Sequence, residues 1–244
     1  MKTVAIIEAR MTSTRLPGKV MLPILGRPTL ELMIERLKRA KLIDQIVVAT
    51  TQNHTDDVVE HLTHRLGVGC FRGSEDDVLD RVLRSAHANG VDVIVEVTGD
   101  CPLIDPIVVD NVIGIYQKKN IDYVSNVLKQ TYPIGMDVQV FSTAVLEKVA
   151  RLTQDPIDHE HVSLYIYEHP EIFSLFNIES DLPEKYWNMR LTLDTQEDYQ
   201  LITAIYELLY PRNPTFTLDD IVDLLEKRKD LIELNRNIQQ KKVR

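Results

Sequence analysis

TVAIIEARMTSTRLPGK, residues 3–19, joins a short apolar segment to a cationic loop. Thr3–Ile7 is apolar or β-branched at every position, without polar alternation. This pattern indicates a strand that is buried on both faces of a parallel sheet. The loop Ala9–Lys19 follows at the carboxyl end of that strand.

Outward from this stretch, apolar runs alternate with amphipathic segments. Strands are predicted at Ile46–Thr50, Gly69–Phe71 and Val91–Thr98, and helices at Pro28–Ala40, Asp56–Leu66, Val78–Ala88 and Pro106–Tyr116. This order implies parallel strands joined by right-handed crossovers, with helices on both faces of the sheet. The predicted fold class is therefore α/β: a Rossmann-like, mostly parallel sheet flanked by helices.

The regular alternation weakens near residue 121. Short strands are predicted at 122–126, 136–141, 172–178 and 190–193, and helices at 144–152, 158–169, 195–209 and 219–240. Thr217 and Asp220 have the spacing of a capping box at the start of the last helix. The simplest organisation is one domain over residues 1–244 that contains a small irregular insert at 120–185.

Composition excludes several classes of protein. The 244 residues carry 28 Lys and Arg against 37 Asp and Glu, a formal net charge of −9, which argues against nonspecific nucleic-acid binding. Cys70 and Cys101 form no CxxC pair, so a reducing compartment is expected. The first apolar run is too short for a signal peptide or a membrane span. We therefore expect a cytoplasmic protein that binds no membrane.

In such a sheet, ligands bind beyond the carboxyl ends of the strands. The loop Ala9–Lys19 places Arg10, Arg15 and Lys19 there, together with three hydroxyl side chains. It lacks the Walker pattern, yet Arg and Lys in this position suit a phosphate-binding loop. A solvated, charged turn is the alternative interpretation.

Carboxylates follow two predicted strands. Asp100 and Asp194 are each placed to hold Mg²⁺, a hard cation that takes oxygen ligands. Each has an alternative role, Asp100 in an Asx turn or helix cap and Asp194 as a helix cap. Asp105 is expected to cap the next helix, Asp198 to face outward, and Cys101 to be a packing residue rather than a nucleophile.

Three further polar segments are candidates for substrate contacts. In DHEH, residues 158–161, the two His side chains point apart on a helix, which disfavours a shared zinc site. Gly135 and Asp137 can form a tight turn that aims polar groups into a cleft. Arg72–Asp77 can read a nucleobase, or can simply form a turn in which Ser74 or Asp76 caps the next helix.

Together, ARMTSTRLPGK, TGDCPLIDP and LTLDTQED resemble the cytidylyltransferase superfamily that includes CMP-3-deoxy-manno-octulosonate synthetase and CMP-sialic acid synthetase. With GSEDDVLDR, GMDVQVF and EHV, the chain looks most similar to the spore coat polysaccharide branch. It departs from the octulosonate enzymes in a shorter middle insert and at Arg72–Asp77, which replaces their SGT-acid-Arg element.

The resemblance implies a nucleotide-diphospho-sugar-transferase-like fold that uses CTP and Mg²⁺. It implies catalytic roles for Arg10, Lys19, Asp100 and Asp194, with Asp100 and Asp194 as the metal ligands. Contacts to the nucleotide are expected from Ala9, Arg10, Ser13, Arg15, Lys19, Arg72, Gly73, Ser74 and Asp100. Contacts to the sugar are expected from Asp137, Gln139, Glu160 and His161.

The implied reaction moves CMP from CTP to an acidic sugar and releases pyrophosphate, in the biosynthesis of a surface polysaccharide or glycan. A homodimer is also implied, with the 120–185 insert contributing to acceptor binding and dimerisation. Two alternatives remain open at this point. One is a sugar-1-phosphate nucleotidylyltransferase that uses another NTP, and the other is a non-catalytic nucleotide-binding protein.

Overall fold

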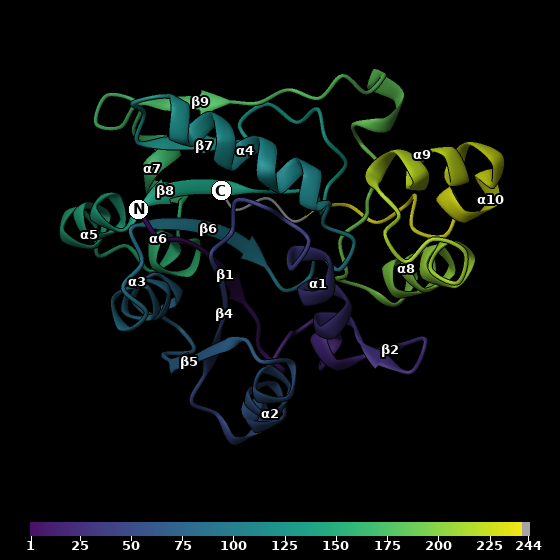
Figure 1. Cartoon of the computed structure of the whole chain (residues 1–244), viewed down its shortest axis with the longest axis horizontal. Helices are drawn as coiled ribbons and strands as arrows, with labels where there is room; N and C mark the ends of the chain where they lie inside the picture. Colours follow the sequence, from purple (N-terminus) through teal and green to yellow (C-terminus); the bar gives the residue numbers. More distant parts are fainter. Residues whose placement is uncertain (241–244) are drawn as a thin grey trace.

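The computed structural model describes residues 1–240. Seven strands form one sheet in the order β5-β4-β1-β6-β8-β7-β9 (Figure 1). Their bounds are β1 Thr3–Glu8, β4 Gln45–Thr51, β5 Gly69–Gly73, β6 Val93–Thr98, β7 Tyr123–Ser125, β8 Gln139–Ser142 and β9 Leu175–Asn177. A separate ribbon pairs β2 Pro23–Ile24 with β3 Arg27–Pro28.

The sheet is mostly parallel, as predicted. Strand β1 pairs in parallel with β4 on one side and with β6 on the other, whereas β8 runs antiparallel to both of its neighbours. The chain passes from β1 to β4 and β5, and then returns across β1 to β6. This reversal places a topological switch point at the carboxyl ends of β1 and β6, where α/β sheets bind ligands.

Helices cover both faces of the sheet. The longer helices are α1 Thr29–Leu37, α2 Asp57–Leu66, α3 Val78–Ala88, α4 Pro106–Lys118, α5 Thr143–Leu152, α8 Gln196–Leu209 and α9 Leu218–Lys227. Single-turn helices are α6 Pro156–Glu160, α7 Leu164–Glu168 and α10 Lys229–Ile232, and 3₁₀ turns lie at Lys19–Met21, His54–Asp56 and Glu184–Tyr186.

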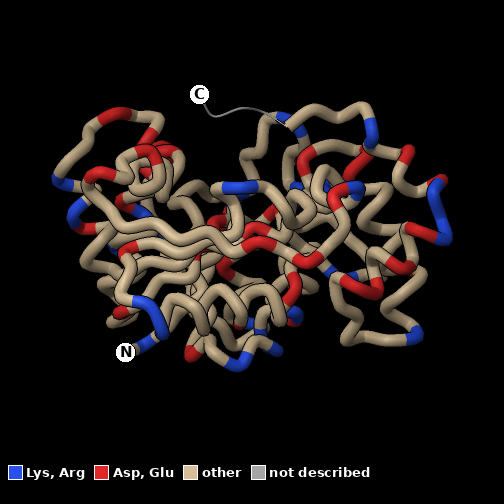
Figure 2. The backbone as a smooth tube through the Cα atoms, turned by 90° about the horizontal axis from the view of Figure 1, so that it is seen from above, with Lys and Arg blue, Asp and Glu red and all other residues tan. Residues whose placement is uncertain are grey.

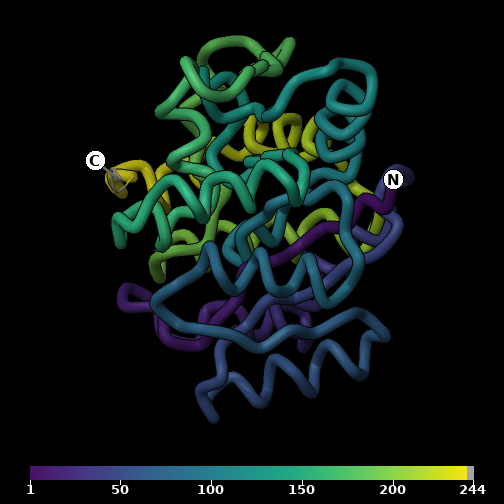
Figure 3. Tube along the Cα trace, turned by 90° about the vertical axis from the view of Figure 1, so that its left-hand side faces the viewer, coloured from purple at the N-terminus to yellow at the C-terminus, as the bar shows by residue number. Residues whose placement is uncertain are grey.

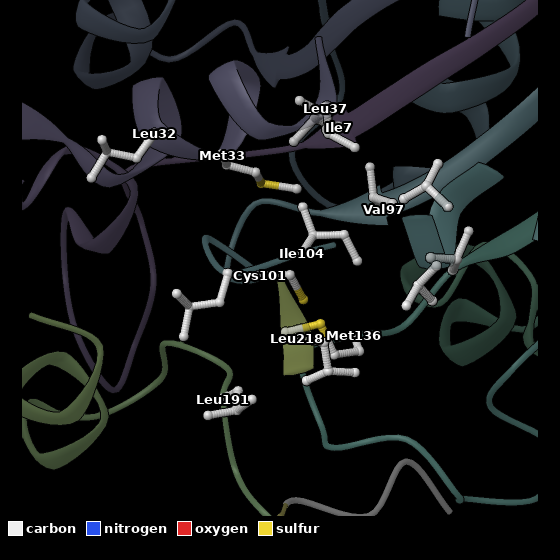
Figure 4. Close-up of a cluster of buried hydrophobic side chains, with 14 of the residues drawn as sticks. Ile7, Leu32, Met33, Leu37, Val97, Cys101, Ile104, Met136, Leu191 and Leu218 are labelled. Atoms are coloured by element: carbon white, nitrogen blue, oxygen red, sulfur yellow. The ribbon is translucent and has the colours of Figure 1, made fainter. Parts of the chain in front are cut away.

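Alternation along β1 assigns its side chains to two buried cores. Ala5 and Ile7 pack with α1, α2, α4, α8 and α9, and Figure 4 shows part of this cluster around Met33, Ile104 and Leu191. Val4 and Ile6 point to the other face, toward α3, α5 and α7. The polar end of β1 therefore emerges between two packed layers, which hold the loops at this edge of the sheet in place.

Several predicted elements differ from the structure. Residues 190–193 form no strand; Arg190 makes a single bridge to Ile134. The helix predicted over 158–169 is two short helices, α6 and α7, and the one predicted over 219–240 ends at Lys227 before α10. Arg228, between α9 and α10, has φ −121° and ψ 64°, which interrupts the helix.

The 120–185 segment contributes β7, β8, β9 and α5 to α7. Figure 3 shows its green part at the opposite end of the molecule from the blue helix α2. In Figure 2, Lys and Arg positions are dispersed among Asp and Glu positions. Within residues 1–240, no helix is both long and apolar enough to cross a bilayer.

Candidate functional site

Two adjoining cavities open at the switch point. The first, about 300 Å³, is lined by the loop after β1, the start of the loop after β6, part of α3 and Asp194. The second, about 490 Å³, extends toward Asp137 and Thr192. The residues that line both are Arg15, Thr98, Asp100, Glu160, His161 and Asp194.

The structure gathers most of the predicted site residues around these cavities. The first is lined by Ala9, Arg10, Ser13, Arg15, Lys19, Asp100, Glu160, His161 and Asp194, and the second adds Asp137. Arg72, Gly73, Ser74 and Gln139 line neither cavity. The loop Ala9–Lys19, Asp100 and Asp194 therefore meet, as the sequence predicts.

The loop after β1 closes on itself. The Gly18 amide donates to the Met11 carbonyl over 2.8 Å, and the Met11 amide donates to Asp56 over 2.8 Å. Gly18 has φ +71°, a left-handed conformation that glycine adopts without strain. These contacts fix the base of the loop, so that Arg15 and Lys19 line the first cavity.

Lys19 lies at the centre of the site. Its Nζ donates to Asp100 Oδ2 and to Asp194 Oδ1, each over 2.8 Å. Burial lowers the pKa of Lys19, but the charges of the two carboxylates outweigh burial and raise the net pKa. Burial likewise raises the pKa of Asp100, and Lys19 together with the Thr98 hydroxyl brings it below its usual value. Asp100 and Asp194 therefore face the same point, at Lys19 Nζ.

Asp194 belongs to a larger ionic network. Arg15 contacts Asp194 Oδ1 at 3.0 Å, and Arg190 contacts Asp194 Oδ2 at 2.8 Å. Thr195, rather than Asp194, caps α8, which removes the alternative role considered for Asp194. Behind Asp194, the loop is tied to the loop after β6, since the Leu193 amide donates to the Asp100 carbonyl over 2.7 Å.

Asp198 is buried, so the expectation that it faces outward is wrong. Its carboxylate accepts from Arg190 Nε at 2.9 Å and from Asn235 Nδ2 at 2.8 Å. It also accepts from the backbone amides of Asp194 and Thr195, at 3.0 Å each. Arg190 is itself buried, and its charge is compensated by Asp194 and Asp198 together.

Residues 72–77 line neither of the two cavities. Arg72 turns away from both cavities and pairs with Asp57 at 2.7 Å and Glu60 at 2.8 Å. Glu75 contacts the loop after β1, where its carboxylate lies 3.5 Å from the Arg10 guanidinium. Asp77, rather than Ser74 or Asp76, caps α3.

Only some of the residues that were predicted to contact the sugar line the cavities. Gln139 is turned into the layer beneath the cavities, where its Oε1 accepts from the hydroxyls of Tyr123 and Ser163. Glu160 and His161 stand where α6 ends, and they reach the cavities because the helix stops there. His159 points elsewhere, with Nδ1 2.9 Å from Asp77. The structure thus joins Glu160 and His161 to the site but not His159 or Gln139.

Sequence reasoning missed Glu8 and Arg81, which also line the first cavity. Burial raises the pKa of Glu8 to about 7, with Arg81 opposing the shift and Asp100 adding to it. The available signal was a lone acidic residue at the end of an apolar strand, where burial of a carboxylate is costly.

Asp137, in the second cavity, has a pKa that makes the stability of the protein depend on pH. Burial raises its pKa to about 6, the Gly135 amide opposes this, and Asp100 adds to it. A carboxyl whose pKa rises on folding binds its proton more tightly in the folded state. Wild-type stability should therefore fall as the pH rises from about 4 to about 6, relative to Asp137→Asn.

Urea denaturation of both proteins at pH 4 and pH 8 measures this difference. From pH 4 to pH 8, the free energy of unfolding of Asp137→Asn should rise by roughly 2 kcal/mol relative to that of wild type. This figure is discounted for the partial exposure of Asp137. A constant difference between the two proteins would show that Asp137 is well solvated.

The comparisons with known proteins agree with this geometry. A family model described as Cytidylyltransferase matches residues 4–240. The chain belongs to the cytidylyltransferase family. The resemblance seen in the sequence is therefore confirmed, and with it the nucleotidyltransferase class.

Three relatives show the extent of the similarity. The spore coat polysaccharide biosynthesis protein SpsF of Bacillus subtilis is 34% identical, over 92% of this chain and 94% of its own. A 3-deoxy-manno-octulosonate cytidylyltransferase of Geobacter metallireducens is 28% identical, over 93% of this chain and 99% of its own. The solved structure of a cytidylyltransferase from Leptospira borgpetersenii is 34% identical with a TM-score of 0.91, over 98% of this chain and 100% of that one.

Proposed function

We propose that this cytidylyltransferase moves CMP from CTP to an oxygen of an acidic sugar. The acceptor oxygen bonds to the α-phosphorus, the bond to the β-phosphate bridging oxygen breaks, and pyrophosphate leaves. The observation that carries the proposal is the convergence of Arg15, Lys19, Asp100 and Asp194 at one cavity. The name of the octulosonate relative supports a sugar acid as the acceptor, and the name of SpsF supports a role in polysaccharide biosynthesis.

Asp100 and Asp194 fit a divalent cation. Their oxygens already hold one cationic atom, Lys19 Nζ, at 2.8 Å from each. Among residues 1–240, no group of three or more His, Cys, Asp or Glu is arranged to hold a metal. Two carboxylates completed by substrate phosphates and water are a usual set of ligands for Mg²⁺. When bound there, Mg²⁺ would supply positive charge to the reacting phosphate.

The cationic loop would act on the leaving group. Arg10, Arg15 and Lys19 would bind the β- and γ-phosphates and stabilise the charge that develops on pyrophosphate. Lys19 would exchange its carboxylate partners for phosphate oxygens when the nucleotide binds. Ser13 and the Ala9 backbone line the same cavity and would orient the nucleoside.

Pyrophosphate release from CTP, UTP, ATP and GTP, each with Mg²⁺ and a panel of sugar acids and sugar 1-phosphates, tests the proposal. We expect release with CTP and a sugar acid. Release with another NTP and a sugar 1-phosphate would instead identify a sugar-1-phosphate nucleotidylyltransferase. Binding of CTP without release in any combination would favour a non-catalytic nucleotide-binding protein.

Arg15→Ala should weaken the binding of CTP far more than the binding of CMP. Arg15 would contact the β- and γ-phosphates, which CMP lacks, and a charge-assisted hydrogen bond contributes about 1.5–3 kcal/mol. We expect CTP affinity to fall roughly 10- to 150-fold, measured by calorimetry. Equal losses for both nucleotides would place Arg15 at the base or the ribose.

A further inference from the structure

One end of the first cavity is left without a role in the proposed transfer. The loop after β1 would hold the phosphates, and the acceptor would enter from the second cavity. The first cavity is also lined by Glu8, at the end of β1, and by Val78 and Arg81 of α3, and none of these three lines the second cavity. This end opens to the first cavity alone and is therefore the place that remains for the nucleobase.

The walls of this end combine an apolar surface with a fixed cation. Val78 is buried and offers a branched apolar side chain on which a flat base can pack. Arg81 is buried too, and its Nη1 donates to the backbone carbonyls of Ser74 and Glu75. A Cβ at Gly73 would stand 2.9 Å from Arg81 Cγ, so the glycine leaves Arg81 the room that it occupies. Arg81 is therefore already held in place before a ligand binds.

Glu8 is the acidic group at this end. Val4 and Ile6 lie on the face of the sheet that α3 covers, and Glu8 follows them in the alternation along β1. Its side chain is half-buried: Oε1 is buried without a hydrogen-bond partner within residues 1–240, whereas Oε2 is not fully buried. Arg81 acts on Glu8 through its charge, without a hydrogen bond. Glu8 thus offers a ligand in the cavity an acceptor that the described part of the chain leaves unused.

We propose that Glu8 accepts a hydrogen bond from the exocyclic amine of the nucleobase and thereby selects CTP over UTP. This inference rests on the proposed function and explains its choice of pyrimidine nucleotide. Cytosine carries a donor, the N4 amine, where uracil carries an acceptor, O4. An ionised carboxyl can only accept, so uracil would set two acceptors against each other. A site built to pair with a polar group of its substrate rejects the analogue that lacks it, because the group of the site is left unpaired.

Glu8→Gln tests the proposal, because an amide can either accept from cytosine or donate to uracil. Calorimetry measures the dissociation constants for CTP and UTP with Mg²⁺ at pH 8, where Glu8, whose pKa burial raises to about 7, is mainly ionised. We expect wild type to bind CTP roughly tenfold or more tightly than UTP, as for one base-specific contact. In Glu8→Gln the two constants should agree within about threefold, mainly because UTP binds more tightly.

Glu96→Gln is the matched control. Glu96 is a buried carboxyl on the neighbouring strand β6, on the same face of the sheet because its register partner on β1 is Ile6, and it lines neither cavity. This variant should keep the wild-type preference for CTP. An equal loss of preference in both variants would mean that selectivity follows from the packing of the sheet, and would overturn the assignment of Glu8.

The other outcomes separate this inference from the proposed function. A preference for CTP that is unchanged in Glu8→Gln overturns the inference and leaves the transfer of CMP intact. Equal binding of CTP and UTP by wild type does the same. If wild type binds neither nucleotide, the proposed function is wrong as well.

A comparison of ligands tests the same contact without relying on the stability of a variant. The triphosphate of pyrimidin-2-one riboside is CTP without its amine, and wild type should bind it roughly tenfold or more weakly than CTP. Glu8→Ala removes the acceptor and should bind both compounds about equally. Equal affinities in wild type, or the same loss in wild type and in Glu8→Ala, would show that Glu8 does not bind the amine.

Discussion

Asp100→Asn is expected to lower the turnover number about a thousandfold while the protein stays folded. Replacing this carboxylate would remove a charged ligand of the divalent cation, which corresponds to about 4 kcal/mol of transition-state stabilisation. Lys19 keeps its contact with Asp194 at 2.8 Å, so the loop after β1 should hold its position. The initial rate of pyrophosphate release from CTP at saturating Mg²⁺ measures the effect.

Thermal unfolding separates this effect from damage to the fold. The melting temperature of Asp100→Asn should lie within a few degrees of wild type. Asp194→Asn makes the same chemical change at the other carboxylate, but it also weakens the compensation of Arg15, Lys19 and Arg190. We expect that variant to lose stability as well as turnover. Full activity of Asp100→Asn at limiting Mg²⁺ would contradict its role as a metal ligand.

The sequence predicts this site well where strands are long and parallel. Apolar runs without alternation locate β1, β4 and β6, and the carboxyl ends of parallel strands lie at one edge of a sheet. From those two facts, the loop Ala9–Lys19 and Asp100 must come together. Asp194 was placed at the same edge because residues 190–193 were predicted to form a strand; they form none, yet Asp194 does line the same cavity as Asp100.

Prediction was poorest where tertiary contacts replace regular secondary structure. Residues 190–193 look like a strand because apolar and polar positions alternate. In the structure, the Thr192 hydroxyl and the Leu193 amide bond to the Asp100 carbonyl, so this backbone joins no sheet. The outward placement of Asp198 was wrong because a helical pattern does not reveal that a buried arginine, Arg190, needs a second carboxylate.

Asp198→Ala is expected to lower the free energy of unfolding by about 3–5 kcal/mol. The change leaves the buried Arg190 with Asp194 as its remaining carboxylate, which Arg15 and Lys19 also share. Removing one partner from a buried ionic network in this way is strongly destabilising. It also removes an acceptor for Asn235 Nδ2 and for the amides at the start of α8. Urea denaturation at pH 7 measures the loss.

Asp220→Ala provides the matched control. Asp198 and Asp220 occupy the same position in capping boxes, with Thr195 on α8 and Thr217 on α9. Within residues 1–240, Asp220 pairs with no buried arginine, so its loss should cost about 1 kcal/mol, as expected for a helix cap. The difference between the two variants therefore measures what Asp198 contributes through Arg190. Equal losses would mean that Asp194 alone compensates Arg190, and that Asp198 acts as an ordinary capping residue.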